Sequence, residues 1–288
     1  MVFIKFEPAI RAKGIPMFFT TPTDGTTLAY EDYGTGPAIV FVAGAMLASD
    51  MWEYQIPFFA DLGYRCISLD RRGHGRSDRP RGGYDLDTTV DDLAALLDHL
   101  DLTEATLVGH STGGVEIARY LARHGESRVA RVAFVSSMLP FLKLTDDNPG
   151  GAPVAVLEDM LHRIRTDRPK WLARQSQLYF AEQFGTEVSP EQSDLTYRQC
   201  LSTAPWATLK IQEAVFHADS REAVRGITVP ALIVHGDADF SAPIDMTGRR
   251  TAELLPGATY REYQAAGHGL YVTHAEQLNN DLLEFIKA

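Results

Sequence analysis

The stretch LVGHSTGG, residues 107–114, decides the fold, because a single hydroxyl, Ser111, stands between two glycines directly after an apolar run. Residues 105–110 (ATLVGH) have the composition of a buried strand. The residues that follow, from about 113 to 124, have a helical pattern that ends at Gly125. Ser111 is therefore predicted to occupy a sharp strand-to-helix turn, which is the structural context of the G-x-S-x-G nucleophile motif.

The spacing of the glycines explains why such a turn tolerates few other residues. Gly109 and Gly113 stand two residues before and two residues after Ser111, where a sharp turn would press a side chain against the neighbouring strand and helix. Thr112 begins the helix, and its N–H is predicted to form half of an oxyanion hole, because a helix N-terminus favours negative charge. A glycine-rich turn with an incidental serine is the alternative interpretation.

The apolar runs around this turn predict one α/β domain. Short strand-like runs alternate with helical patterns, which implies a mostly parallel sheet with right-handed crossovers. The first two runs form a hairpin across the turn TDGT. The predicted strands are 17–21, 27–34, 38–44, 64–70, 105–110, 129–137, 229–239 and 258–264. The predicted helices outside residues 138–217 are about 50–62, 87–101, 113–124 and 274–287. We expect a twisted, mostly parallel eight-stranded sheet flanked by helices.

The alternation breaks between residues 138 and 217, where the pattern stays helical and rich in aromatic side chains. We predict that this segment is a helical lid inserted after the sixth strand, above the edge where open α/β sheets bind ligands. Residues 1–137 and 218–288 are then the core domain. We also predict five wall residues of an apolar substrate pocket. For each of them, packing within the lid itself is the alternative. These wall residues are Met138, Leu139, Phe141, Trp171 and Trp206.

A serine nucleophile needs a base and an acid that orients the base. His268 stands in a loop of small residues after the last predicted strand, and Asp237 and Asp239 follow the strand before it. The order Ser, Asp, His along the chain is that of α/β hydrolases. Asp239 is the preferred acid because it lies further into its loop, and Asp237 is expected to hold the turn by accepting backbone N–H groups.

Composition excludes several classes of function. The chain has 288 residues, of which 45% are hydrophobic and 23% charged, as in an ordinary globular domain. Its formal net charge of −11 argues against binding to nucleic acid or to an anionic membrane surface, both of which attract basic proteins. Residues 1–14 contain no continuous apolar run for a secretory signal. The two cysteines form no disulfide framework, and no motif predicts a metal or another cofactor. We expect a soluble, cytoplasmic protein, with homo-oligomer formation left open.

Four stretches together resemble the α/β-hydrolase family, and specifically its cofactor-free haloperoxidase and arylesterase branch. They are DRRGHGRSDRP (70–80), GHSTGGVEIARYLARHG (109–125), VHGDADFSAP (234–243) and GHGLYVTHAEQLNNDLLEFI (267–286). The resemblance implies that Ser111 is the nucleophile, His268 the general base and Asp239 the acid. It also implies that the backbone N–H of Ala45 is the second oxyanion donor. Members of this branch hydrolyse esters or lactones, and some make peracids from carboxylic acids and hydrogen peroxide.

The chain departs from the family pattern at one place. Members usually carry His-Gly after the third strand, and the histidine braces the oxyanion loop, whereas this chain has Ala43 and Gly44. The stretch DRRGHGRSD, residues 70–78, lacks the third glycine of a dinucleotide-binding loop. We interpret it as a strand-end turn that leads into the next helix.

The sequence therefore predicts a serine hydrolase that cleaves a small apolar ester or lactone through a Ser-His-Asp triad and an acyl-enzyme. Two alternatives are perhydrolysis on the same triad and a small-molecule receptor built on the hydrolase fold. A dehalogenase or epoxide hydrolase is disfavoured, because those enzymes carry aspartate where this chain has Ser111. A histidine base with an ordinary pKa of about 6.5 predicts activity that falls below neutral pH.

Overall fold

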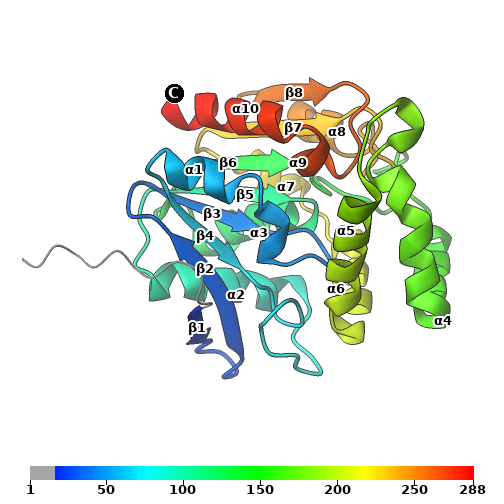
Figure 1. Ribbon diagram of the computed structural model, residues 1–288, viewed down its shortest axis with the longest axis horizontal. Helices are drawn as coiled ribbons and strands as arrows, with labels where there is room; N and C mark the ends of the chain where they lie inside the picture. Colours follow the sequence, from blue (N-terminus) through cyan, green and yellow to red (C-terminus); the bar gives the residue numbers. More distant parts are fainter. Residues whose placement is uncertain (1–16) are drawn as a thin grey trace, which may run out of the picture.

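The computed structural model describes residues 17–288, and these residues form one twisted sheet of eight strands with helices on both faces (Figure 1). The strands are β1 (Met17–Thr20), β2 (Thr27–Tyr33), β3 (Ala38–Val42), β4 (Arg65–Leu69), β5 (Ala105–His110), β6 (Val129–Val135), β7 (Ala231–Gly236) and β8 (Thr259–Tyr263). The predicted α/β-hydrolase fold is confirmed. The N-terminal segment in which no secretory signal is predicted lies outside the described residues.

The sheet has the order β1-β2-β4-β3-β5-β6-β7-β8. β1 and β2 form the predicted antiparallel hairpin, and β2 is also antiparallel to β4, while every other neighbouring pair is parallel. The central strand β5 is buried along its whole length. That burial on both faces explains why its sequence is a continuous apolar run instead of an alternating one.

Helices fill the connections between the strands. They are the 3₁₀ helices η1 (Ser49–Trp52) and η2 (Glu182–Phe184), and the α-helices α1 (Ile56–Asp61), α2 (Leu86–His99), α3 (Thr112–His124), α4 (Val154–Tyr179), α5 (Pro190–Ser202), α6 (Pro205–His217), α7 (Arg221–Arg225), α8 (Gly248–Leu254), α9 (Leu270–Thr273) and α10 (Ala275–Lys287). α2 and α3 pack on one face of the sheet, and α1, α9 and α10 pack on the other.

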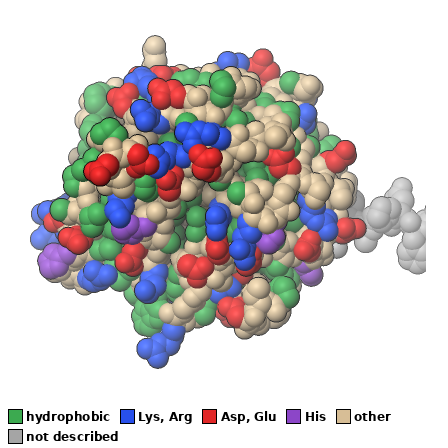
Figure 2. Space-filling view, turned by 180° about the vertical axis from the view of Figure 1, so that it is seen from behind, with side chains coloured by type: hydrophobic (Ala, Val, Ile, Leu, Met, Phe, Trp, Pro, Cys, Tyr) green, Lys and Arg blue, Asp and Glu red, His purple; other side chains and the backbone are tan. Residues whose placement is uncertain are grey.

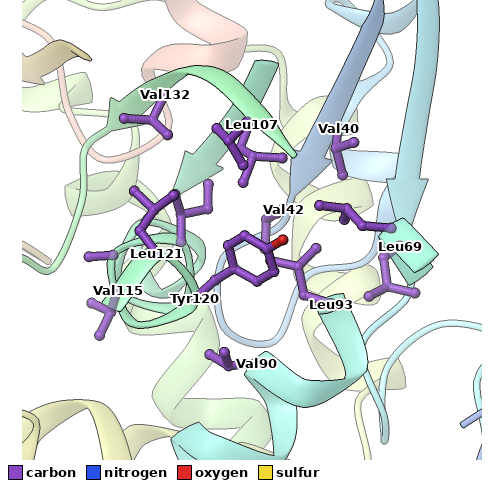
Figure 3. Close-up of a cluster of buried hydrophobic side chains, with 14 of the residues drawn as sticks. Val40, Val42, Leu69, Val90, Leu93, Leu107, Val115, Tyr120, Leu121 and Val132 are labelled. Atoms are coloured by element: carbon purple, nitrogen blue, oxygen red, sulfur yellow. The ribbon is translucent and has the colours of Figure 1, made fainter. Parts of the chain in front are cut away.

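The two faces of the sheet carry separate hydrophobic cores because successive strand residues point to opposite sides. On β3, Val40 and Val42 belong to the core beneath α2 and α3, which Figure 3 shows around the ring of Tyr120. Ile39 and Phe41 belong to the core beneath α1 and α10. The carboxyl end of β3 is therefore fixed by packing on both sides.

Two predicted helical segments are wrong in part. The helix predicted at about 50–62 is split into η1 and α1, because Pro57 at the first turn of α1 starts a new helix there. The segment predicted as helical from residue 138 is irregular up to Pro153, and α4 begins only at Val154. Proline and glycine in NPGGAP, residues 148–153, interrupt the helical pattern.

The segment between β6 and β7 contains the three long helices α4, α5 and α6. Figure 1 shows them beside the sheet, at the edge toward which the parallel strands point. α4 is kinked at Asp167, whose φ and ψ are −157° and 79°, and Pro169 follows within the helix. Asp167 Oδ1 accepts a hydrogen bond from the backbone N–H of Lys170, so this side chain caps the second half of α4.

The surface carries both signs of charge. Figure 2 shows acidic and basic side chains interspersed over the rear face of the molecule. Exposed ion pairs such as Arg249 with Glu262 hold some of these side chains together. Of the helices that residues 17–288 form, none combines the length and the apolar composition needed to cross a bilayer.

Candidate active site

The turn between β5 and α3 holds Ser111 in a left-handed backbone conformation, with φ 54° and ψ −117°. Such a conformation costs a non-glycine residue about 1–3 kcal/mol unless its surroundings enforce it. The N–H of Ser111 donates to the Val135 carbonyl oxygen at 3.0 Å, and its own carbonyl oxygen accepts from the N–H groups of Gly114 and Met138, both at 3.2 Å. β6, α3 and the chain after β6 thus hold the turn in place.

The two flanking glycines are packed as closely as the sequence predicts. A Cβ atom on Gly109 would lie 2.7 Å from the carbonyl carbon of Gly113. A Cβ atom on Gly113 would overlap the carbonyl oxygen of Val42. The predicted requirement for glycine on both sides of Ser111 is confirmed, because in each case the obstacle is backbone that has no freedom to turn aside.

The structure brings together the three residues of the predicted triad from three different loops. His268 Nε2 lies 2.9 Å from Ser111 Oγ, and His268 Nδ1 lies 2.7 Å from Asp239 Oδ2. Ser111, Asp239 and His268 are 3%, 5% and 4% exposed. The arrangement matches a nucleophile that is hydrogen-bonded to a base, with the base oriented by a carboxylate.

Asp239 also holds its own turn, which corrects the role predicted for its neighbour. Its Oδ1 accepts hydrogen bonds from the backbone N–H groups of Ser241 at 2.9 Å and Ala242 at 2.8 Å. Asp237, which was expected to make such bonds, has an exposed side chain. The reason is geometric, since the chain turns after Asp239 and brings the following N–H groups back onto its carboxylate.

Asp239 is held as a carboxylate. Burial alone would raise its pKa, but the electrostatic interaction with His268 and the hydrogen bonds from His235 and His268 outweigh burial. The pKa of Asp239 therefore lies well below its usual range. Asp239 stays ionised throughout the pH range in which a histidine base titrates, so its charge is available to stabilise the imidazolium.

His110 packs against His268 and hydrogen-bonds its backbone. Its Nε2 lies 2.9 Å from the carbonyl oxygen of His268, so the Nε2–H donates there, and the two rings lie 4.7 Å apart between centroids. Burial, followed by the nearby charge of His268, lowers the pKa of His110 to about 3. His110 is therefore neutral at neutral pH, and its hydrogen bond fixes the backbone of the loop that carries His268.

Two backbone N–H groups beside Ser111 have no hydrogen-bond acceptor among residues 17–288. One belongs to Thr112, the first residue of α3, and the other to Ala45, which lies in the loop after β3 and lines a cavity together with Ser111. Gly44 lies so close to the nucleophile that an added Cβ would be 3.2 Å from Ser111 Cβ. These two N–H groups are the candidate oxyanion donors.

A cavity of about 830 Å³ opens from Ser111 and His268 toward α4. Its lining combines apolar side chains with a charged stretch of α4. The apolar lining residues are Ala45, Met46, Leu47, Met138, Val156, Met160, Trp171, Leu172, Tyr179, Cys200 and Phe240. The charged ones are Asp159, Arg163, Asp167, Lys170 and Arg174. Among residues 17–288, no group of three or more His, Cys, Asp or Glu side chains could hold a metal ion.

Two of the five predicted wall residues, Met138 and Trp171, line the cavity. The other three are corrected by the structure. Leu139 is fully buried in the core beneath α3, and Phe141 packs beneath the arginine that begins α7. Trp206 lies on α6 outside the cavity and is 44% exposed. Residues 138–153 form an irregular segment, so Leu139 and Phe141 do not share the direction of Met138 although they are close to it in sequence.

The sequence interpretation missed most of the α4 contribution to the cavity. Met160, Arg163 and Asp167 follow each other at three- and four-residue steps, which place them on one side of a helix. This periodicity was available in the sequence. Phe240 also lines the cavity, and its position directly after Asp239 was a second usable signal.

Comparison with known proteins establishes the family. The alpha/beta hydrolase fold family matches residues 37–275, so the chain belongs to that family and is an enzyme of the α/β-hydrolase superfamily. It is 39% identical over 272 residues to a non-heme chloroperoxidase from Streptomyces lividans, covering 93% of this chain and 99% of the relative. It is 35% identical to the bifunctional esterase/perhydrolase DCH of Acinetobacter calcoaceticus, over 94% of this chain and all of the relative.

The solved structures agree with this assignment. The crystal structure of a bromoperoxidase from Bacillus anthracis superposes with a TM-score of 0.91 and 34% identity, over 95% of this chain and all of that one. The chain therefore belongs to the cofactor-free haloperoxidase and esterase-like branch of the family.

The close packing at the elbow predicts a specific cost for enlarging it. Gly113→Ala should lower the free energy of unfolding by about 2 kcal/mol or more, because the new methyl group meets the backbone of β3. Urea denaturation measures this free energy. Gly150→Ala is the matched control, since Gly150 is exposed with open space around its Cα. Equal unfolding free energies for the two variants would contradict the packing argument.

Proposed function

We propose that this protein is a serine hydrolase that cleaves a small carboxylic ester or lactone through Ser111, His268 and Asp239. One observation carries the proposal. It is the unbroken hydrogen-bonded series from Asp239 through His268 to Ser111 at the wall of a cavity of about 830 Å³. The α/β-hydrolase superfamily supplies the chemical context, and its members include relatives described as esterases.

In the first half of the reaction, Ser111 Oγ attacks the ester carbonyl while His268 Nε2 takes the hydroxyl proton. The carbonyl π-electrons move onto oxygen, which becomes an oxyanion beside the N–H groups of Ala45 and Thr112. Removing one such donor costs roughly 3–4 kcal/mol of transition-state stabilisation in serine hydrolases. Collapse of the tetrahedral intermediate breaks the bond to the alcohol, which leaves with the proton from His268.

In the second half, water enters and His268 takes a proton from it. The resulting hydroxide attacks the acyl carbonyl of the acyl-enzyme. The ester bond to Ser111 Oγ then breaks, and His268 returns its proton to that oxygen. Asp239 holds the Nδ1–H of the base, and thereby keeps Nε2 free to accept a proton in each half of the cycle. The carboxylic acid then leaves through the same cavity.

The lining favours an apolar group near the reacting carbon. Methionine and tryptophan side chains line the same cavity as Ser111, with Met46 from the loop after β3, Met138 from the segment after β6 and Trp171 from α4. Residues 138–217 act as a lid in this proposal, because α4 supplies the side of the cavity that faces the nucleophile across the open space. A short acyl or aryl ester, or a lactone ring, fits within this volume.

Removing the nucleophile tests the proposal directly. Ser111→Ala should reduce kcat for 4-nitrophenyl acetate by roughly 10⁶-fold, as expected when the residue that forms the acyl-enzyme is lost. The release of 4-nitrophenolate measures the rate. Ser202→Ala removes an exposed hydroxyl from α5 and should keep the wild-type rate. Full activity in Ser111→Ala would overturn the assignment.

The acid is tested by an isosteric neutral replacement. Asp239→Asn should lower kcat about 10³- to 10⁴-fold with a small change in KM, because the amide neither stabilises the imidazolium nor enforces the correct tautomer. Steady-state kinetics on the same ester separate the two constants. Asp237→Asn is the matched control, since the carboxylate of Asp237 is exposed and lies two residues before Asp239. A similar kcat for Asp239→Asn and Asp237→Asn would assign the acid elsewhere.

Perhydrolysis is a second candidate, favoured by relatives described as a non-heme chloroperoxidase and a bifunctional esterase/perhydrolase. In that reaction Ser111 is acylated by a carboxylic acid with loss of water, hydrogen peroxide attacks the acyl carbonyl in place of water, and the bond to Ser111 Oγ breaks to release a peracid. Wild-type protein with acetate and hydrogen peroxide should then form peracetic acid, detected by bromide oxidation, whereas Ser111→Ala should not. Ester hydrolysis without any peracid would restrict the protein to water as the acyl acceptor.

A further inference from the structure

The loop that carries the proposed oxyanion donor, residues 43–49, is held by side chains from elsewhere in the chain. Arg71 Nη2 donates to the carbonyl oxygen of Ala43 at 2.8 Å, and its Nη1 donates to that of Gly44 at 3.3 Å. The guanidinium group is itself held by Glu116 on α3, with contacts of 2.6 and 2.7 Å. Both side chains of this ion pair are buried, so its position is fixed.

His74 holds the next part of the loop. Its Nδ1 lies 2.9 Å from the carbonyl oxygen of Arg72, so the Nδ1–H donates there and leaves a lone pair on Nε2. That Nε2 accepts the backbone N–H of Met46 at 3.3 Å. Burial, followed by the charge of Arg71, lowers the pKa of His74 to about 3, so the ring keeps its lone pair at neutral pH.

The third contact comes from the segment between α5 and α6. Thr203 Oγ1 donates to the carbonyl oxygen of Met46 at 2.9 Å, and Thr203 is 2% exposed. The next residue, Ala204, donates its N–H to the carbonyl oxygen of Gly73 at 2.8 Å. Met46 has a φ of 63°, which a residue with a side chain rarely adopts without outside support.

These contacts fall on four successive peptide planes, the first of which joins Ala43 to Gly44 and is also held by Arg71. Each peptide group is planar and trans, so holding its C=O also fixes the direction of its N–H. Arg71 holds the plane that joins Gly44 to Ala45, and this plane contains the candidate donor N–H. His74 holds the plane that follows, and Thr203 holds the plane after that.

We propose that Arg71, His74 and Thr203 are positioning residues that aim the Ala45 N–H at the oxyanion, with Thr203 linking the segment 138–217 to the hole. The proposal rests on the function proposed above. It assigns a role to the stretch DRRGHGR, residues 70–76, beyond that of a strand-end turn. It also makes the segment between β6 and β7 part of the catalytic geometry as well as a wall of the cavity.

The test removes the hydroxyl of Thr203 and keeps its shape. Thr203→Val should lower kcat for 4-nitrophenyl acetate about tenfold, less than the full loss of an oxyanion donor, because the Ala45 N–H is displaced and not deleted. KM should change little, since the oxyanion forms only after binding. The inhibition constant of phenylboronic acid, which forms a tetrahedral adduct on a serine, should rise by a similar factor.

Three further variants separate positioning from a general loss of structure. Thr203→Ser keeps the hydroxyl and should restore kcat, and Thr203→Ala should behave like Thr203→Val, because both lack the hydroxyl and alanine adds no bulk that could distort the site. Thr196→Val is the matched control. Thr196 is a buried threonine on α5, and among residues 17–288 its hydroxyl bonds only the carbonyl of Gln192 one turn earlier, with no hydrogen bond to residues 43–49. The thermal midpoint of each variant reports its stability.

The outcomes distinguish this inference from the function on which it rests. If Ser111→Ala retains esterase activity, the proposed function fails. If Ser111→Ala is inactive but Thr203→Val and Thr203→Ala keep the wild-type kcat and boronate affinity, the positioning role is wrong and the triad stands. A tenfold loss in Thr196→Val as well would also overturn the positioning role, because the effect would then follow from the loss of any buried hydroxyl.

Discussion

The strained backbone of Ser111 is the constraint on which the rest of the site depends. A residue with φ 54° and ψ −117° needs neighbours that enforce it, and here three N–H or O–H groups converge on its carbonyl oxygen, from Gly114, Ser137 and Met138. Those donors are correctly placed only if α3 lies tightly against β5 and β6. The glycines at 109 and 114 permit that approach. The conformation of the nucleophile is therefore a consequence of sheet packing.

The same packing makes it feasible to bury the charges. An isolated carboxylate in an apolar interior is too costly to keep ionised, so each buried one must be paired and hydrogen-bonded. Asp239 meets this need through His268 and two backbone N–H groups, and Glu116 meets it through Arg71. Because removing a partner would leave an uncompensated charge, both clusters resist rearrangement. One cluster orients the base, and the other holds the loop that carries Ala45.

The sequence predicted those features that depend on local pattern or chain order. All eight strands and the convergence of Ser111, Asp239 and His268 followed from apolar runs, turn chemistry and the order of the loops along one sheet edge. The cavity wall did not follow, because residues 138–153 are irregular and no period relates one side chain direction to the next. Leu139 and Phe141 accordingly point into the core, although Met138 beside them faces the cavity.

The bracing of the oxyanion loop was also beyond sequence reasoning, for a different physical reason. Ala43 has no polar side chain that could hydrogen-bond its own loop. The hydrogen bonds that hold this loop come instead from residues distant along the chain, namely Arg71, His74 and Thr203. No spacing rule connects positions 46 and 203. Once the hydrogen bonds are known, however, their effect follows from peptide planarity, because four successive anchored planes fix the direction of the N–H groups between them. A displacement of the α5–α6 junction must therefore move the Ala45 N–H or break a bond to Met46. In the proposed function, the segment that lines the cavity therefore also controls the direction of the Ala45 N–H.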